Sequence, residues 1–229
     1  GLIGGSLAAA LRASGYAGQI IACDPNEQEV ALGIELGLVD AGGVELANCL
    51  KGVSMVVLAV PVLAMESVMS TLSRSLDQAA PDVVITDVGS TKATIRDCAE
   101  RVFGRVMPNI VLGHPIAGSE KSGVAAANPS LYVNHKVILT PEPDVDPVAL
   151  ARVETLWRAC GADVLQMSVE RHDQVLARTS HLPHLLAFSL VDTLARQDER
   201  LDIFRYAAGG FRDFTRIAGS DPVMWRDIF

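Results

Sequence analysis

The sequence predicts an α/β protein: a Rossmann-type, doubly wound, mostly parallel sheet followed by an all-helical C-terminal domain. Short apolar runs alternate with helical patterns over residues 1–167, as expected where helices cover both faces of a parallel sheet. The chain opens on a glycine-rich turn that leads into a helix, GLIGGS. After residue 167 the strand signals stop. We therefore expect a dinucleotide-binding domain over 1–167, lacking its first strand, and a helical substrate and dimerisation domain over 168–229.

The apolar runs of the first domain have the length of buried strands. They predict strands at 19–23, 53–60, 83–87, 110–113, 136–140 and 164–167. Helical spacing predicts helices over 1–14, 26–36, 64–76, 92–103 and 147–160. Asn26 is the expected N-cap of the second helix, and Ser90 or Thr91 that of the helix from 92.

The second domain reads as one long helix, from 168 to about 197, and two shorter helical stretches joined by Gly209 and Gly210. One face of the long helix is rich in polar groups at four-residue spacing: His172, Leu176, Ser180 and His184. His181 neighbours this stripe, and Asp173 lies two turns before His181. A solvent-facing stripe is the simplest interpretation. Pro183 inside the helix predicts a kink, because it frees the carbonyl of Thr179.

Composition excludes several classes of partner. The net charge of -8 argues against nucleic acid and anionic membranes, because both need a basic face. The longest strongly apolar stretch, 55–65, is too short to span a bilayer, and no signal peptide is visible. The four cysteines form no CxxC pair and predict buried, reduced thiols in a cytoplasmic protein. Because the chain starts within a motif and ends within a helical pattern, we expect both ends to be cut from a longer protein.

The opening GLIGGS fits the second half of the motif G-x-G-x-x-G/A. Gly1 would be the second glycine, which lets the backbone approach a pyrophosphate, and Gly4 the third. Together with Leu2 and Ile3, they place the amides of a helix N-terminus at the phosphates. A Gly-rich turn that binds no ligand would fit the same residues equally well.

Asp24 supports the dinucleotide interpretation, because it ends the next predicted strand about 20 residues after the glycines. A carboxylate there accepts from the ribose 2′-hydroxyl and repels a 2′-phosphate, so NAD is favoured over NADP. Asp24 could equally open a turn with Pro25 and Asn26, and both roles are compatible. Val60 and Pro61, at the carboxyl end of the following strand, should line the cofactor crevice.

Three later segments are more specific. They are ITDVGSTK (85–92), GHPIAGSEKSG (113–123), and the pair SHLPH (180–184) with GGFRDFTRIAGSDPVMWRDI (209–228). In this order behind GLIGGS, the chain resembles the prephenate/arogenate dehydrogenase family over essentially its whole length. The resemblance implies NAD-dependent oxidative decarboxylation of prephenate to 4-hydroxyphenylpyruvate in tyrosine biosynthesis. The sequence does not decide between prephenate and arogenate as the substrate. Arogenate would undergo the same reaction and carries an amino group instead of a keto group.

His114 is the candidate general base. It follows a strand end and precedes Pro115, which places its imidazole at the carboxyl edge of the sheet, where ligands bind. A histidine is suited to accept the proton of a substrate hydroxyl near neutral pH. The resemblance implies that His114 bonds the ring hydroxyl of prephenate and that Ser90 bonds the same group. It also implies a gating ion pair for Glu120 at the pocket mouth.

The resemblance assigns the helical domain to substrate binding. It places His181 and His184 at the side-chain end of prephenate, whereas their spacing alone could suggest a metal site, for which no third ligand is apparent. We expect no metal. The resemblance also implies that Arg216 binds a substrate carboxylate and that Asp213 orients the surrounding network. A guanidinium can bind a carboxylate bidentately. Arg212 is the competing arginine. Trp225 could close the pocket or pack in a core.

Two other function classes remain to be weighed. A hydroxyacid dehydrogenase of the 6-phosphogluconate type would need a catalytic lysine in the helical half, and no lysine follows Lys136. A non-catalytic dinucleotide-sensing module would bind NAD without turnover. The helical half predicts a homodimer, because a long helix with mixed faces exposes apolar surface unless a partner covers it.

Overall fold

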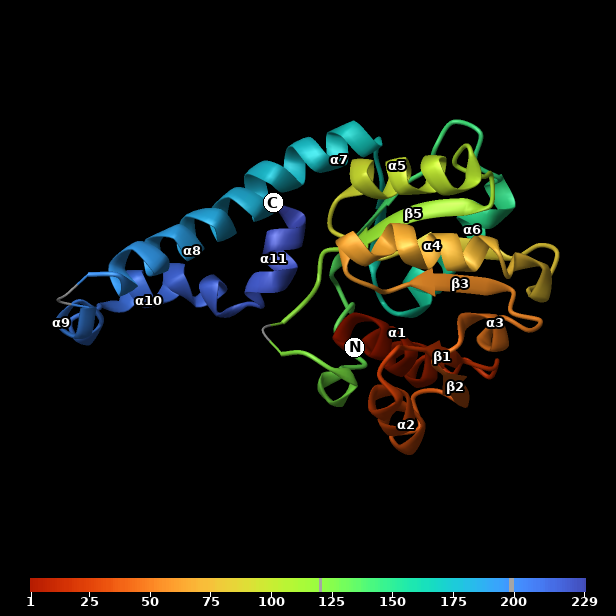
Figure 1. Cartoon of the computed structure of the whole chain (residues 1–229), viewed down its shortest axis with the longest axis horizontal. Helices are drawn as coiled ribbons and strands as arrows, with labels where there is room; N and C mark the ends of the chain where they lie inside the picture. The colour runs from red at the N-terminus through yellow and green to blue at the C-terminus, as the bar shows by residue number, and fades with distance from the viewer. Residues whose placement is uncertain (120, 198–199) are drawn as a thin grey trace.

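A computed structural model describes residues 1–119, 121–197 and 200–229. A sheet covered by helices forms the larger part, and a helical arm extends from it (Figure 1). The predicted fold class is confirmed, because a mostly parallel sheet is followed, in the residues that the structure describes, by helices without a further strand. Among the described residues no helix is long and apolar enough to cross a membrane.

The main sheet has five strands in sequence order: β3 (Met55–Leu58), β4 (Val84–Asp87), β5 (Ile110–Pro115), β6 (Lys136–Thr140) and β7 (Asp163–Gln166). All neighbours are parallel except β5 and β6, which are antiparallel. β1 (Ile21–Cys23) pairs in parallel with β2 (Ala41–Gly43) in a separate two-stranded sheet. The sequence did not predict β2, because Ala41, Gly42 and Gly43 form no apolar run. The short α3 (Leu46–Cys49) was not predicted either.

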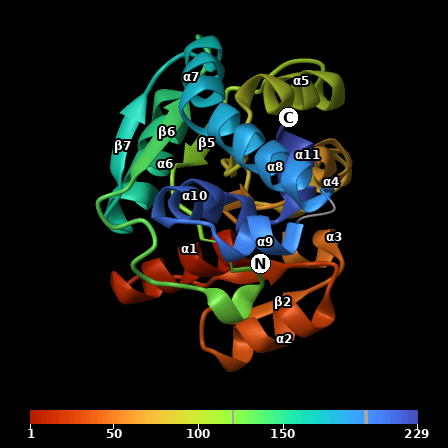
Figure 2. The ribbon, with the colours of Figure 1, turned by 90° about the vertical axis from the view of Figure 1, so that its left-hand side faces the viewer.

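Helices cover both faces of the main sheet. α1 (Leu2–Ala13) and α6 (Pro147–Ala159) pack on one face, and α4 (Met65–Ser73) and α5 (Lys92–Phe103) on the other (Figure 2). The alternation within β4 shows this directly, because Val84 belongs to the first core and Ile85 to the second. Such two-sided burial explains why the strands read as continuous apolar runs. α2 (Glu27–Glu35) packs beside β1 and β2, and Asn26 caps it as predicted by accepting from the Gln28 amide.

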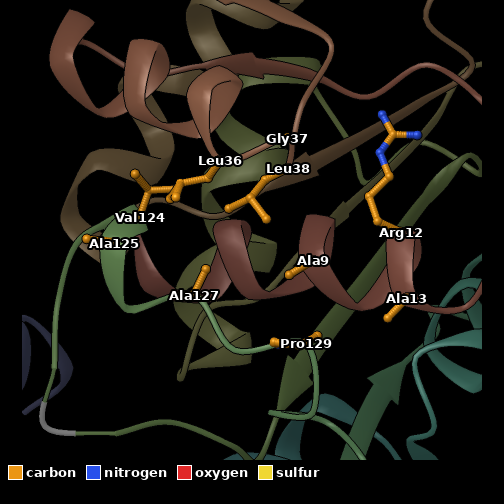
Figure 3. Close-up of a pocket in the computed structure, with 10 residues that line it drawn as sticks. All are labelled: Ala9, Arg12, Ala13, Leu36, Gly37, Leu38, Val124, Ala125, Ala127 and Pro129. Carbon is orange, nitrogen blue, oxygen red and sulfur yellow. The ribbon is translucent and has the colours of Figure 1, made fainter.

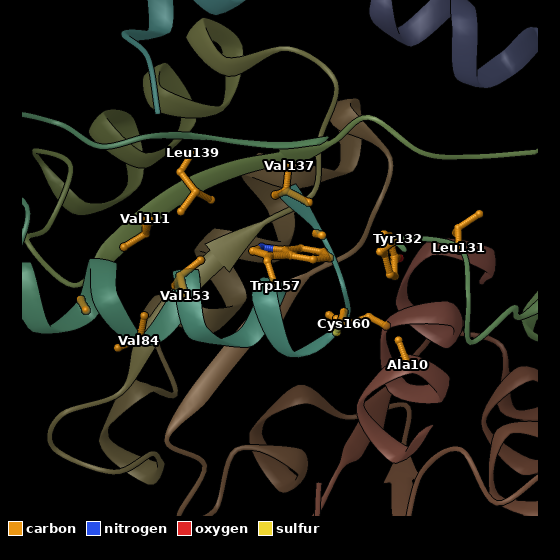
Figure 4. Close-up of a cluster of buried hydrophobic side chains, with 13 residues drawn as sticks. Ala10, Val84, Val111, Leu131, Tyr132, Val137, Leu139, Val153, Trp157 and Cys160 are labelled. Atoms are coloured by element: carbon orange, nitrogen blue, oxygen red, sulfur yellow. The ribbon is translucent and has the colours of Figure 1, made fainter. Parts of the chain in front are cut away.

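The first core centres on Trp157, which is fully buried beneath the sheet (Figure 4). Its ring meets that of Tyr132 edge to face, with centroids 5.1 Å apart. Truncation of such a buried aromatic to alanine costs roughly 3–5 kcal/mol. The Tyr132 hydroxyl donates to the backbone oxygen of Ile3 at 2.6 Å, which ties this core to the start of α1.

Gly4 allows α1 to lie close to the sheet. A Cβ atom at this position would meet the Cβ of Ala59, just after β3, at 3.2 Å. This is the close helix–strand packing that the third glycine of a dinucleotide motif provides.

The long helix of the second part is continuous but changes geometry. α7 (Val169–Leu176) leads into a π-helical turn, η4 (Ala177–His181), and then into α8 (Leu182–Ala195). Ser168 caps α7 by accepting from the Arg171 amide. Pro183 lies in the first turn of α8, so the disturbance that it was predicted to cause takes the form of the π-helical turn.

The remaining helices double back along the arm. α9 (Arg200–Arg205), α10 (Gly209–Thr215), the short η5 (Arg216–Gly219) and α11 (Pro222–Ile228) follow α8. α11 contacts η1 (Val62–Ala64), the turn just after β3, so the end of the chain returns to the sheet region (Figures 1 and 2).

The cysteines are free, but one prediction about them was wrong. Cys49, Cys98 and Cys160 are buried, whereas Cys23 is exposed. Cys23 is the last residue of β1 in a two-stranded sheet, where fewer elements cover it than cover the strands of the main sheet.

Candidate active site

His114 lies near the carboxyl end of β5, as predicted, but within the strand rather than after it, because β5 extends two residues beyond the predicted 110–113. It is partly buried, and its Nδ1 atom lies 2.9 Å from Nε2 of His172 on α7. The strand therefore presents the ring from the sheet region, while the helical part supplies its hydrogen-bonding neighbour. Sequence reasoning had placed His172 on a solvent-facing stripe, which is wrong, because this side chain is fully buried.

Asp173 connects this pair to α5. Its Oδ1 atom lies 2.7 Å from Nδ1 of His172 and also accepts from the Lys92 amide, while Oδ2 accepts from the Ala93 amide. The carboxylate thus caps α5 from another part of the chain. Thr91 occupies the N-cap position, one of the two residues predicted for it, but its side chain makes no capping hydrogen bond.

A buried ion pair holds the loop that carries Ser90. The Lys92 ammonium pairs with Asp87 at the end of β4 and donates to the Gly113 oxygen at 2.6 Å. Asp87 also accepts from the amides of Gly89 at 2.8 Å and Gly113 at 3.0 Å. Lys92 and Asp87 are fully buried, so the backbone on both sides of Ser90, and next to His114, is fixed.

The charges around His114 favour its neutral form. Burial lowers its pKa well below the ordinary value of 6.5, and the nearby Lys92 cation and His172 lower it further. Asp173 acts in the opposite direction. Burial alone would raise the pKa of Asp173, but hydrogen bonds from His172 and from the Lys92 and Ala93 amides hold it at about 2. A neutral imidazole and an ionised carboxylate therefore coexist at neutral pH.

His181 and His184 lie together with Trp225. The ring of His184 stacks on the indole with centroids 3.7 Å apart, and His181 approaches it edge to face at 6.0 Å. Burial lowers the pKa of His181. Within the part of the chain that the structure describes, six buried side-chain polar atoms have no partner, and two of them belong to this cluster: His181 Nε2 and Trp225 Nε1. Because buried polar atoms are normally paired, these atoms indicate a place for a polar ligand.

The arginines predicted for substrate binding stand at the end of α10 and the start of η5. Arg212, Asp213 and Arg216 are exposed, and among the described residues none of the three forms an ion pair. η5 packs against α8, the helix of His184. Glu120 lies outside the described residues, so the structure does not place it.

The predicted cofactor residues lie at the start of α1, just after β1 and just after β3. Gly1 is the N-cap of α1. Asp24 follows β1 and accepts from the Asn26 amide at 2.9 Å, which confirms the turn that its sequence predicted. Val60 is partly buried, and Pro61, which is exposed, precedes η1.

A surface pocket of about 410 Å³ lies elsewhere, between α1, the loop 36–38 and η3 (Val124–Ala126) (Figure 3). It is lined mainly by small apolar groups, with Arg12 as its charged residue. None of the candidate residues lines this pocket. Among the described residues no group of three or more metal-ligating side chains could hold a metal ion.

The fold and the cluster define a class of protein: a Rossmann-type nucleotide-binding domain with a helical domain that completes a histidine site at its sheet edge. A family model described as "Prephenate dehydrogenase, nucleotide-binding domain" matches residues 7–166. A second, "Prephenate dehydrogenase, dimerization domain", matches residues 168–229. The chain belongs to the prephenate dehydrogenase family.

Individual relatives support the assignment of the chain to this family. A prephenate dehydrogenase of Bacillus subtilis is 39% identical over the whole chain, which spans 61% of that protein. A cyclohexadienyl dehydrogenase of Zymomonas mobilis is 36% identical over the whole chain, which spans 77% of it. The structure of prephenate dehydrogenase from A. aeolicus in complex with hydroxyphenyl propionate and NAD+ matches with a TM-score of 0.89 at 40% identity, over all of this chain and 78% of that one.

Proposed function

We propose that the protein catalyses the NAD-dependent oxidative decarboxylation of prephenate to 4-hydroxyphenylpyruvate. The observation that carries this proposal is His114: a neutral imidazole at the end of β5, between the start of α5 and the histidine cluster of the helical part. A neutral histidine there can take the proton of the substrate's ring hydroxyl. The matching family models and the named relatives support the same activity.

Residues at the start of α1 fit a dinucleotide. We assign Gly1, Leu2, Ile3 and Gly4 to the phosphates, because α1 begins there and Gly4 packs tightly on Ala59. When bound, NAD supplies the hydride acceptor. Asp24 would accept from the ribose hydroxyl in addition to its turn contact, while Val60 and Pro61 would line the crevice beside η1. The NAD+ bound in the A. aeolicus enzyme supports this choice of cofactor.

The substrate would lie between His114 and the helical part. His114 accepts the hydroxyl proton as the ring carbonyl forms, the ring carboxylate leaves as carbon dioxide, and the ring becomes aromatic. Ser90 would hold the same hydroxyl. His181 and His184 would contact the side-chain end, Arg216 would bind a carboxylate, Asp213 would orient that arginine's surroundings, and Glu120 would close the pocket mouth. The unpaired Nε2 of His181 supports a polar ligand here.

The two parts of the chain divide these tasks. We assign residues 1–167 to the dinucleotide and 168–229 to the substrate and to a homodimer contact. The description of the second family model as a dimerization domain supports the dimer. So do exposed apolar side chains of the helical part: Leu182, Leu185, Leu186, Phe214, Val223 and Met224. Free thiols suit a cytoplasmic enzyme.

Oxidation of arogenate is the second candidate, favoured by the cyclohexadienyl dehydrogenase among the relatives. The test is to follow NADH absorbance after adding prephenate or arogenate to the protein with NAD. Faster turnover of prephenate supports the proposal, and faster turnover of arogenate replaces it with the second candidate. NAD binding without turnover of either substrate would overturn both and indicate a dinucleotide sensor.

A further inference from the structure

Three side chains form a continuous line of contacts that crosses from the helical part to the sheet. Asp173 contacts His172 at 2.7 Å, and His172 contacts His114 at 2.9 Å. Each histidine is therefore engaged through Nδ1, and the middle ring uses both of its nitrogens. In such a line, the proton on one ring determines the proton on the next.

Asp173 fixes the first proton. It accepts two backbone amides at the N-terminus of α5, a helix of 12 residues, and so it is held ionised. An ionised carboxylate can only accept hydrogen bonds. Nδ1 of His172 must therefore carry the hydrogen that points at Asp173.

The proton position in His172 determines the proton position in His114. A neutral imidazole has one donor and one acceptor nitrogen, so with its hydrogen on Nδ1 the His172 ring presents Nε2 as a lone pair to His114. Nδ1 of His114 must donate to that lone pair. In a neutral His114 the second nitrogen, Nε2, is left without a hydrogen, and among the described residues it has no hydrogen-bond partner.

We propose that His172 and Asp173 are positioning residues, which hold His114 in the Nδ1–H tautomer and leave its Nε2 atom as the proton acceptor. This inference rests on the proposed function. When the substrate O–H bond breaks, a new N–H bond forms at Nε2. The imidazolium keeps its hydrogen bond to His172, and the carboxylate of Asp173 compensates the positive charge through that ring.

The charged neighbours are consistent with this arrangement. Lys92 on α5 opposes a positive His114, but Asp87 on β4 is paired with that lysine. His181 on the π-helical turn adds a ring that stays neutral as burial lowers its pKa. Asp173 is the carboxylate that stabilises the protonated form of His114.

Nuclear magnetic resonance of the ¹⁵N-histidine-labelled chain tests the tautomers without substrate. Ring nitrogen shifts distinguish a protonated from an unprotonated nitrogen in each of the five histidines. Near neutral pH we expect the Nδ1–H tautomer at both His114 and His172. A hydrogen on Nε2 of His114 would overturn the proposal, whether or not the protein turns over prephenate.

Kinetics provide the second test. Asp173→Asn removes the negative charge, so kcat should fall about 10-fold or more and the acid limb of kcat/KM should move to lower pH. Glu170→Gln is the matched control, since Glu170 also joins α7 to α5, through Arg96 at 2.7 Å, without touching His172. The control should keep both values. An unmoved acid limb in Asp173→Asn would show that Asp173 serves only the fold.

Two substitutions at His172 distinguish its role as a hydrogen-bond acceptor from the volume that its side chain fills. His172→Gln keeps an oxygen that can accept from His114, whereas His172→Leu fills a similar volume with no acceptor. We expect the glutamine variant to retain several-fold more turnover. Equal turnover in two folded variants would contradict a role for His172 in holding the tautomer.

Discussion

The ammonium group of Lys92 donates to the backbone oxygen of Gly113 at 2.6 Å, so a fully buried cation holds the residue next to His114. The same ammonium pairs with Asp87, which binds the Gly113 amide. The start of α5, the end of β4 and the end of β5 are thereby locked together. These contacts fix the backbone next to the candidate base, His114.

Breaking this ion pair should cost stability. Lys92→Met leaves the Asp87 charge buried without its cation, and removal of one partner of a buried pair costs about 3–5 kcal/mol. Lys92→Met combined with Asp87→Asn should cost clearly less, because no buried charge is stranded. Urea unfolding of the single and double variants measures both values. Equal losses in the two would show that the pairing contributes little.

The pH profile of the wild type should reflect the lowered pKa of His114. His114 must be neutral to accept a proton, and burial together with Lys92 lowers its pKa below 6.5. Because the neutral form persists as the pH falls through 6.5, kcat/KM for prephenate should stay level there and decline only at lower pH. Initial rates across pH 5–8 measure this. An acid limb centred above pH 6.5 would contradict the electrostatics of the site.

Asp24→Asn should relax the preference for NAD. The asparagine oxygen can still accept from the Asn26 amide, so the turn is kept while the charge that repels a 2′-phosphate is lost. The ratio of kcat/KM for NAD to that for NADP should fall about 10-fold or more, equivalent to about 1.4 kcal/mol. Glu27→Gln, which removes a nearby carboxylate on α2, should leave the ratio unchanged. A constant ratio in Asp24→Asn would remove Asp24 from the cofactor site.

Arg216→Ala should mainly raise KM for prephenate. A hydrogen bond to a charged group contributes about 1.5–3 kcal/mol, so a rise of about 10- to 100-fold is expected with a smaller change in kcat. Arg212→Ala is the matched comparison, because both arginines are exposed and only four residues apart. Steady-state kinetics of the two variants decide the assignment. A larger KM effect in Arg212→Ala would transfer the carboxylate contact to Arg212.

The sequence predicted what depends on local pattern. Strands such as β4 and β5 are continuous apolar runs because both of their faces are buried, and His114 follows from its place at a strand end. The partnership with His172 was not predictable from spacing, because 58 residues separate the two rings. The sequence predicted the N-cap position of α5 at Ser90 or Thr91, and Thr91 occupies it, but the capping hydrogen bonds do not come from its side chain. Asp173 takes this role from 80 residues further along the chain.

His114→Asn tests the central claim most directly. The measurement is NADH formation from prephenate at pH 7, with thermal unfolding as the check that the variant is folded. The account predicts that kcat falls by about 10²- to 10⁴-fold while KM changes little, because the proton acceptor is lost and the binding groups remain. Turnover close to that of the wild type in folded His114→Asn would contradict the account.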